Sequence, residues 1–113
     1  MKEDLLTRRR TYIDLIQGKK FNSKQREMVR KAVDELELHK LRFIAKEGFS
    51  AEQMEQMIKF LKNETYKENK NLFVIFNRND IDWKILEQIN KGLENGLREE
   101  LILMYARPEE YDV

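Results

Sequence analysis

Four short stretches of this chain share one order: an apolar residue, a small polar residue, and then a run whose apolar positions fall three or four apart. In chain order the stretches begin at Phe21, Phe49, Ile81 and Tyr111, with starts 28, 32 and 30 positions apart. The polar residues that follow are Asn22, Ser50, Asp82 and Asp112. Their side-chain oxygens can accept hydrogen bonds from the free amides of a first helical turn. We therefore predict helix N-caps near residues 22, 50, 82 and 112, and an array of helical repeats.

Further signals support the first three of these caps. Gln25 and Gln53 stand three residues after their caps, where each can bond back to the cap amide and complete a capping box. The apolar pairs of a hydrophobic staple are Phe49 with Met54 and Ile81 with Leu86. Arg26 occupies the matching position of the first copy, so a looser junction is expected there.

Apolar positions at helical spacing then predict the individual helices. The expected helices cover residues 3–17, 23–34, 38–46, 51–63, 83–95 and 97–107. Gly18, Gly48 and Gly96 close three of them. A tight turn is expected at residues 34–37, although no glycine or proline excludes one long helix over 23–46. The polar joint at 64–71 is expected to be a mobile loop.

One run is ambiguous between helix and strand. Residues 72–76 (LFVIF) are aromatic and β-branched, which favours a strand. A strand needs a partner, and the only other strand-like run is 101–105, its equivalent in the repeat. Two buried helices are therefore preferred over two parallel edge strands.

Together these patterns predict an all-α protein: a single domain over residues 1–113, with about three and a half helix-turn-helix repeats made of six or seven helices. A chain of 113 residues is long enough to bury roughly 60–70% of its unfolded surface. It has no cysteine, so neither disulfides nor thiolate metal sites are available. No run approaches the roughly 20 apolar residues of a membrane span. A cytoplasmic protein without membrane contact is expected.

Charge is distributed unevenly along the chain. Residues 1–42 contain 12 Lys and Arg against 7 Asp and Glu, whereas residues 43–113 contain 10 against 14. The basic end suggests nucleic-acid contact, because a helix, a glycine-containing turn and a basic second helix resemble a helix-turn-helix. The candidate residues are Arg8, Arg9, Arg10, Lys19, Lys20, Lys24, Arg26, Arg30 and Lys31. Against this, Glu52 and Glu55 occupy the corresponding helix of the second copy, where they would repel phosphate.

Catalytic and metal-binding motifs are not found in the sequence. His39 is the only histidine and has no cysteine with which to share a metal. Residues 77–82 are rich in oxygen ligands but lack the glycine and the final glutamate of a calcium loop. The pairs 99–100 and 109–110 are glutamates expected on the solvated surface. We therefore expect no enzyme activity, no metal and no cofactor.

The repeat pattern also predicts an interaction surface. The chain stops just after the fourth cap, and an unfinished array leaves an apolar flank that a further repeat would cover. The candidate partner-binding residues are Leu97, Leu101, Met104, Tyr105 and Tyr111. A protein partner, or a homodimer formed through this C-terminal flank, is expected.

The last third of the chain resembles a short helical repeat of phage and conjugative-element proteins from Gram-positive bacteria. The likeness is carried by residues 92–97 (GLENGL) and 104–112 (MYARPEEYD). Earlier copies depart from it, because Ala32 replaces a glycine, and Lys46 and Arg78 stand where the repeat has proline. The resemblance implies an accessory protein of a mobile genetic element. Such a protein could occupy a host nucleic-acid-handling or defence complex, as CRISPR inhibitors do.

Overall fold

The computed structural model describes residues 5–106, and in that part of the chain every regular element is a helix. The α-helices are α1 Leu5–Ile16, α2 Ser23–Glu35, α3 Ala51–Lys62, α4 Lys70–Phe76, α5 Trp83–Glu94 and α6 Glu99–Ala106. Two 3-10 helices, η1 Leu38–Phe43 and η2 Glu64–Glu68, complete the set. The all-α prediction is confirmed, and both ambiguous runs are helical, in α4 and α6. The fourth cap at Asp112 lies outside the described residues.

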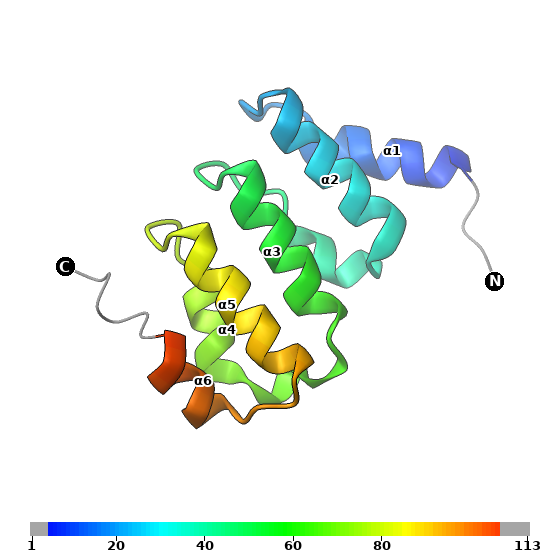
Figure 1. The fold of residues 1–113 in the computed structure, drawn as a ribbon. Coiled ribbons are helices and arrows are strands. Elements are labelled where there is room, and N and C mark those ends of the chain that lie inside the picture. Colours follow the sequence, from blue (N-terminus) through cyan, green and yellow to red (C-terminus); the bar gives the residue numbers. More distant parts are fainter. Residues whose placement is uncertain (1–4, 107–113) are drawn as a thin grey trace.

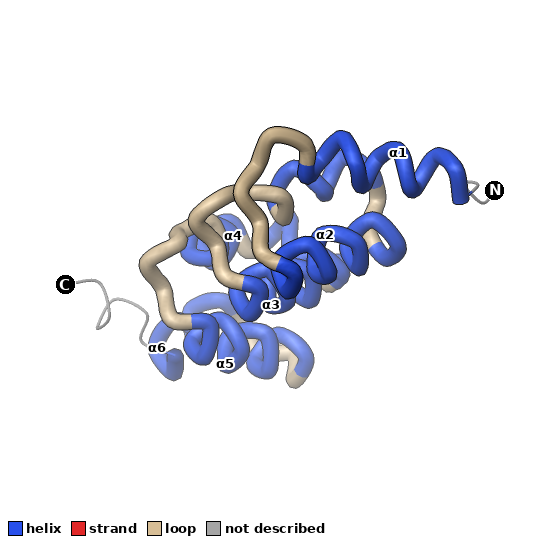
Figure 2. Tube along the Cα trace, turned by 90° about the horizontal axis from the view of Figure 1, so that it is seen from above, coloured by secondary structure: helices blue, strands red, loops and turns tan. Residues whose placement is uncertain are grey.

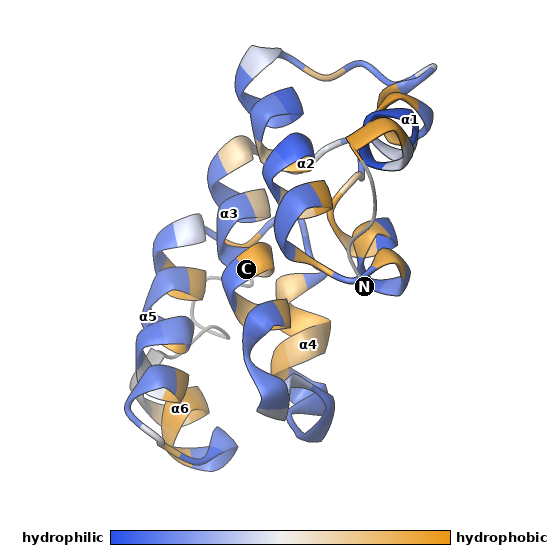
Figure 3. Cartoon of the chain, turned by 90° about the vertical axis from the view of Figure 1, so that its right-hand side faces the viewer, coloured by the Kyte–Doolittle hydropathy of each residue, from blue (hydrophilic) through white to orange (hydrophobic). Residues whose placement is uncertain are grey.

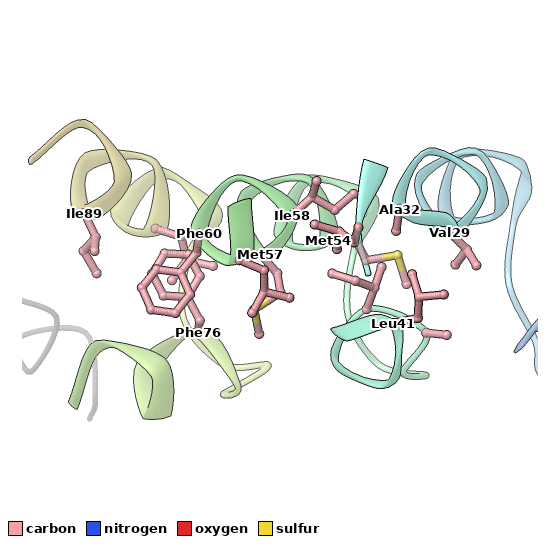
Figure 4. Close-up of a cluster of buried hydrophobic side chains, with 14 of the residues drawn as sticks. Val29, Ala32, Leu41, Met54, Met57, Ile58, Phe60, Phe76 and Ile89 are labelled. Carbon is pink, nitrogen blue, oxygen red and sulfur yellow. The ribbon is translucent and has the colours of Figure 1, made fainter. Parts of the chain in front are cut away.

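The chain folds as successive helices packed in two layers. Helices α2, α3 and α5 lie side by side (Figure 1), and η1 and α4 lie beneath them, with the apolar core between the layers (Figure 4). At the two ends, α1 packs on α2, whereas α6 packs on α5 and α4. The connections that lead into α2, α3 and α5 gather on one side of the molecule (Figure 2). This regular packing is that of a short helical array.

The three predicted N-caps within the described residues are confirmed. The Asn22 side chain accepts from the Gln25 amide at 2.8 Å, and the Ser50 hydroxyl accepts from the Gln53 amide at 3.1 Å. Both glutamines accept in return from the cap amide, which completes two capping boxes. Asp82 caps α5 through the amide of Lys84. These bonds satisfy amides that the helices themselves leave without a partner.

The junction of the first copy differs from the expected loose one. Arg26, which replaces the apolar staple residue, donates from Nη1 to the Phe21 carbonyl at 2.7 Å, and Phe21 is buried. A guanidinium can reach back over its own helix turn to a carbonyl that an apolar side chain could not bond. A hydrogen bond therefore fastens this junction.

The turn predicted at 34–37 is confirmed, because α2 ends at Glu35 and the backbone is extended at Leu36. The following helix is shorter and tighter than expected, a 3-10 helix that ends at Phe43.

The prediction of a mobile loop at 64–71 was wrong. The segment forms η2 and the start of α4, and Asn63 caps η2 by accepting from the Thr65 amide at 2.9 Å. The Tyr66 ring lies 6.1 Å from the Phe60 ring in an edge-to-face arrangement. The Lys40 ammonium sits 4.8 Å from the centre of the Tyr66 ring. One aromatic side chain and several hydrogen bonds thus hold this polar segment on the core.

The capping-box glutamines also join neighbouring repeats. Gln25 Nε2 donates to the Phe49 carbonyl at 2.7 Å, and Gln53 Nε2 donates to the Ile81 carbonyl at 2.9 Å. Phe49 and Ile81 each stand just before the next cap, so the same bond is made at both steps of the array. In the third copy Ile85 occupies the glutamine position and is buried. The series of glutamine bonds therefore stops at α5.

Candidate functional site

Exposed apolar side chains concentrate at the two ends of the array. The large hydrophobic residues exposed within residues 5–104 are Leu5, Leu6, Ile13, Leu38, Val74, Leu97, Leu101 and Met104. The first three belong to α1, and the last three to α6 and the turn before it. Figure 3 shows hydrophobic residues on these end helices as well as on the faces turned to the interior. The two end helices are therefore the candidate interaction elements.

The C-terminal flank, defined here as Leu97, Leu101 and Met104, is accessible to a partner. These side chains are 39%, 46% and 71% exposed. Ile102, on the opposite side of α6, is buried and holds the helix to α5. A Cβ on Gly92 would stand 2.9 Å from Ile102 Cγ1, so a glycine in α5 permits this close approach.

The structure thus brings together three of the five residues predicted for partner binding. Tyr105 lies in α6, but its side-chain surroundings are outside the description, as is all of Tyr111.

Glu99 corrects an expectation about the acidic pair at 99–100. Its carboxylate accepts from the backbone amides of Asn71 at 3.1 Å and Leu72 at 3.4 Å, and from the Asn71 side chain. These are amides of the first turn of α4. The residue before α4, Asn69, makes no cap bond because its side-chain amide donates to Thr65. Glu99 therefore caps α4 from another helix and fixes α6 in place.

A groove opens at the other end, between α1 and α2. This α1–α2 groove has a volume of about 630 Å³ and is lined by Leu5, Arg8, Arg9, Tyr12, Ile13, Arg30, Val33 and Asp34. Its walls are apolar, whereas its charged side chains are three arginines and one aspartate. The helix over residues 3–17 was predicted from the sequence, but the groove was not, because it depends on how α1 packs on α2.

Arg8 is held only loosely in this groove. Its Nη1 lies 4.0 Å from the Asp34 carboxylate, and its Nε is buried without a hydrogen-bond partner in the described structure. A buried donor without an acceptor is energetically unfavourable. The guanidinium therefore has hydrogen-bonding capacity that the chain itself does not use.

The nine predicted nucleic-acid residues do not form one free basic face. Lys19 donates to the Ala45 carbonyl at 2.6 Å, and Arg26 is bonded to Phe21. Arg8, Arg9 and Arg30 line the α1–α2 groove. Arg10, Lys20 and Lys24 are exposed and belong to neither set; Lys19, Arg26, Arg9 and Arg30 are exposed as well, whereas Arg8 and Lys31 are half-buried. The tertiary structure thus assigns several of these cations to contacts within the protein.

The oxygen-rich segment at 77–82 is engaged with cationic side chains. Asn77 Oδ1 accepts from Lys46 Nζ at 2.7 Å, and Asp80 pairs with Arg78 at 2.7 Å. The hydrogen bond from Arg78 lowers the pKa of Asp80 below its ordinary value. Two of the oxygen-bearing side chains of this segment, Asn77 and Asp80, are thus already bonded to cationic side chains of the protein.

The part of the chain that the structure describes has neither a metal-ligand cluster nor a membrane-spanning helix. Between residues 5 and 106, no group of three or more carboxylates and histidines is arranged to hold a metal ion, and His39 is exposed. No helix in the same range combines the length and the apolar character needed to cross a membrane.

Comparisons of the chain with protein-family profiles, with curated proteins and with solved structures gave no match in any of the three.

Proposed function

We propose that the protein is a non-enzymatic interaction protein that binds a protein partner through its C-terminal flank. The observation that carries this proposal is the set of exposed apolar side chains on α6, beside a buried face that keeps the helix in place. Leu97 lies in the segment before α6, and within the helix Leu101 and Met104 are spaced three residues apart. That is the spacing by which helices present anchors to a groove on another protein.

The energetics favour a partner at this flank. Fully burying a leucine or methionine side chain contributes about 1.5–3 kcal/mol. Because Ile102 and Glu99 already fix α6 on the rest of the protein, little conformational entropy is lost when a partner covers the opposite side.

The biological setting of the proposal comes from the resemblance of residues 92–112 to repeats of mobile-element proteins. We infer an accessory role in a phage or conjugative element. The partner expected on this basis is a component of a host nucleic-acid-handling or defence complex, such as a CRISPR effector.

The test is affinity capture from a host lysate with the double variant Leu101→Glu/Met104→Glu. Two charges on the flank should abolish capture of a partner that wild type retains. The matched control is Leu38→Glu/Val74→Glu, which changes residues of similar exposure, 57% and 62%, in the interior repeats. The control should capture the partner as wild type does, and circular dichroism should show the same helix content in all three proteins.

Equal capture by the flank variant and wild type would refute the proposal. So would equal loss in both double variants, because it would show a general dependence on apolar surface.

A second candidate, nucleic-acid binding by the basic N-terminal helices, is favoured by one observation. Arg10, Lys20 and Lys24 are exposed, and the surplus of positive charge lies in this region. Exposed cations of this kind contact phosphate without reading sequence.

A further inference from the structure

We propose that the C-terminal flank docks into the α1–α2 groove of a second copy of the chain, so that copies associate head to tail. This inference rests on the proposed function, because it names the partner of the same flank. Three observations support it: the fit of helix to groove, the distribution of charge between the ends, and the positions of the two surfaces in the array.

The dimensions of helix and groove agree. Helix α6 has eight residues, which span about 12 Å at 1.5 Å per residue. The groove-lining part of α1 runs from Leu5 to Ile13, nine residues or about 14 Å. The walls offered by Leu5, Tyr12, Ile13 and Val33 are apolar, as Leu101 and Met104 are. A helix the length of α6 can therefore lie along the groove with its apolar side inward.

The charges of the two ends are complementary. Residues 43–98 contain nine acidic and nine basic residues, so the acidic surplus of the C-terminal part lies entirely in residues 99–113. That stretch has five acids against the single base Arg107; Glu100 is exposed on α6, Glu99 is bonded to α4, and Glu109, Glu110 and Asp112 lie outside the described residues. The α1–α2 groove opposes them with three arginines and one aspartate. Opposite potentials on two surfaces favour their association and set its orientation.

The two surfaces lie at opposite ends of one array, on α1 and α6 (Figure 1). A contact between two different surfaces is heterologous, so a bound pair leaves one groove and one flank free. Docking thus covers the exposed apolar residues of both end helices, as the next repeat of a longer array would. Open chains of copies are the expected product, rather than a closed dimer.

The test is a mixing experiment followed by sedimentation. Wild type should associate progressively with concentration at low salt, and less at high salt because screening weakens the charge attraction. The groove variant Leu5→Glu/Ile13→Glu and the flank variant Leu101→Glu/Met104→Glu should each be monomeric. Each substitution pair should raise the dissociation constant of self-association at least about tenfold.

An equimolar mixture of the two variants should form a one-to-one complex, because each supplies the surface that the other lacks. Leu38→Glu/Val74→Glu should behave as wild type.

Three results would overturn the inference. Wild type that stays monomeric at low salt and high concentration would exclude self-association. A groove variant that still forms dimers would show that flank meets flank. Monomeric variants that form no complex when mixed would exclude the pairing of the two ends. In each case, if the flank is still needed to capture a host protein, the proposed function stands. If instead the protein self-associates but captures no host protein, its function is confined to assembly of the chain itself.

Discussion

At the scale of single residues, Gln53 links local and long-range structure. Its amide oxygen accepts from the Ser50 backbone at 2.8 Å and completes the capping box of α3. Its Nε2 donates to the carbonyls of Asn79 and Ile81 in the next repeat. The donor and acceptor capacities of one side-chain amide thus set both where a helix begins and how two repeats meet.

The caps lead to a residue-scale prediction. Ser50→Ala removes the acceptor of the Gln53 amide and should reduce the free energy of unfolding by about 0.5–2 kcal/mol. Ser23→Ala is the matched control, because Ser23 is the first residue of α2 and the cap of that helix is Asn22. Urea unfolding measures both. Equal losses would mean that the assigned caps are misplaced by one residue.

At the scale of elements, α4 shows how a run with strand-like composition becomes a helix. No strand is present within residues 5–106 to pair with it. As a helix, it places Phe76 against Phe60 with ring centres 4.3 Å apart, and Phe73 against Phe43 at 4.9 Å. Aromatic contacts of this kind stabilise beyond the area that they bury. Packing against α3 and η1 thus outweighs the weak β-propensity of the run.

The trans cap on α4 gives an element-scale prediction. Glu99→Ala leaves the amides of Asn71 and Leu72 without their acceptor, so unfolding should cost about 0.5–2 kcal/mol less, as for other lost caps. Glu100→Ala, at an exposed neighbouring position, should change stability by no more than about 0.5 kcal/mol. Denaturant titration of both variants is the measurement. Similar effects at the two positions would argue against the capping role.

At the scale of the whole molecule, the distribution of charge separates the two candidate functions. The basic surplus of residues 1–42 and the acidic surplus of residues 99–113 lie at opposite ends of the chain. Two of the cations predicted to bind nucleic acid, Lys19 and Arg26, are exposed but already donate to backbone carbonyls. Partner binding by α1 and α6 would involve both the exposed apolar side chains and the charged side chains of these two end helices.

A salt titration of DNA binding distinguishes nucleic-acid binding from partner binding. On duplex DNA each neutralised phosphate contributes about −0.9 to the slope of the logarithm of affinity against the logarithm of salt concentration. If the protein is an interaction module, fluorescence anisotropy with a short duplex should show no binding tighter than the nonspecific range of roughly 10⁻⁴–10⁻⁶ M. The variant Arg10→Gln/Lys20→Gln/Lys24→Gln should then match wild type. Tight binding whose slope is reduced by about 3 in this variant would instead support the nucleic-acid function.

The sequence alone determined where most helices begin and end. A cap such as Ser50 and its box partner Gln53 are three residues apart, and a buried stripe such as Met54, Met57, Ile58 and Leu61 repeats within one helix. These signals act over one or two turns, so they can be read without knowing the path of the chain. The apolar flank at Leu97, Leu101 and Met104 was predicted from the repeat pattern, which is also legible along the chain.

Only the tertiary structure decided which side chains act between distant segments. Glu99 caps a helix 27 or more positions away, and Lys19 bonds a carbonyl 26 positions away. The α1–α2 groove likewise depends on how α1 packs against α2. Spacing along the sequence does not determine such contacts, because they depend on which helices the loops bring together. The same charged side chain can face solvent in one packing and bond a backbone group in another.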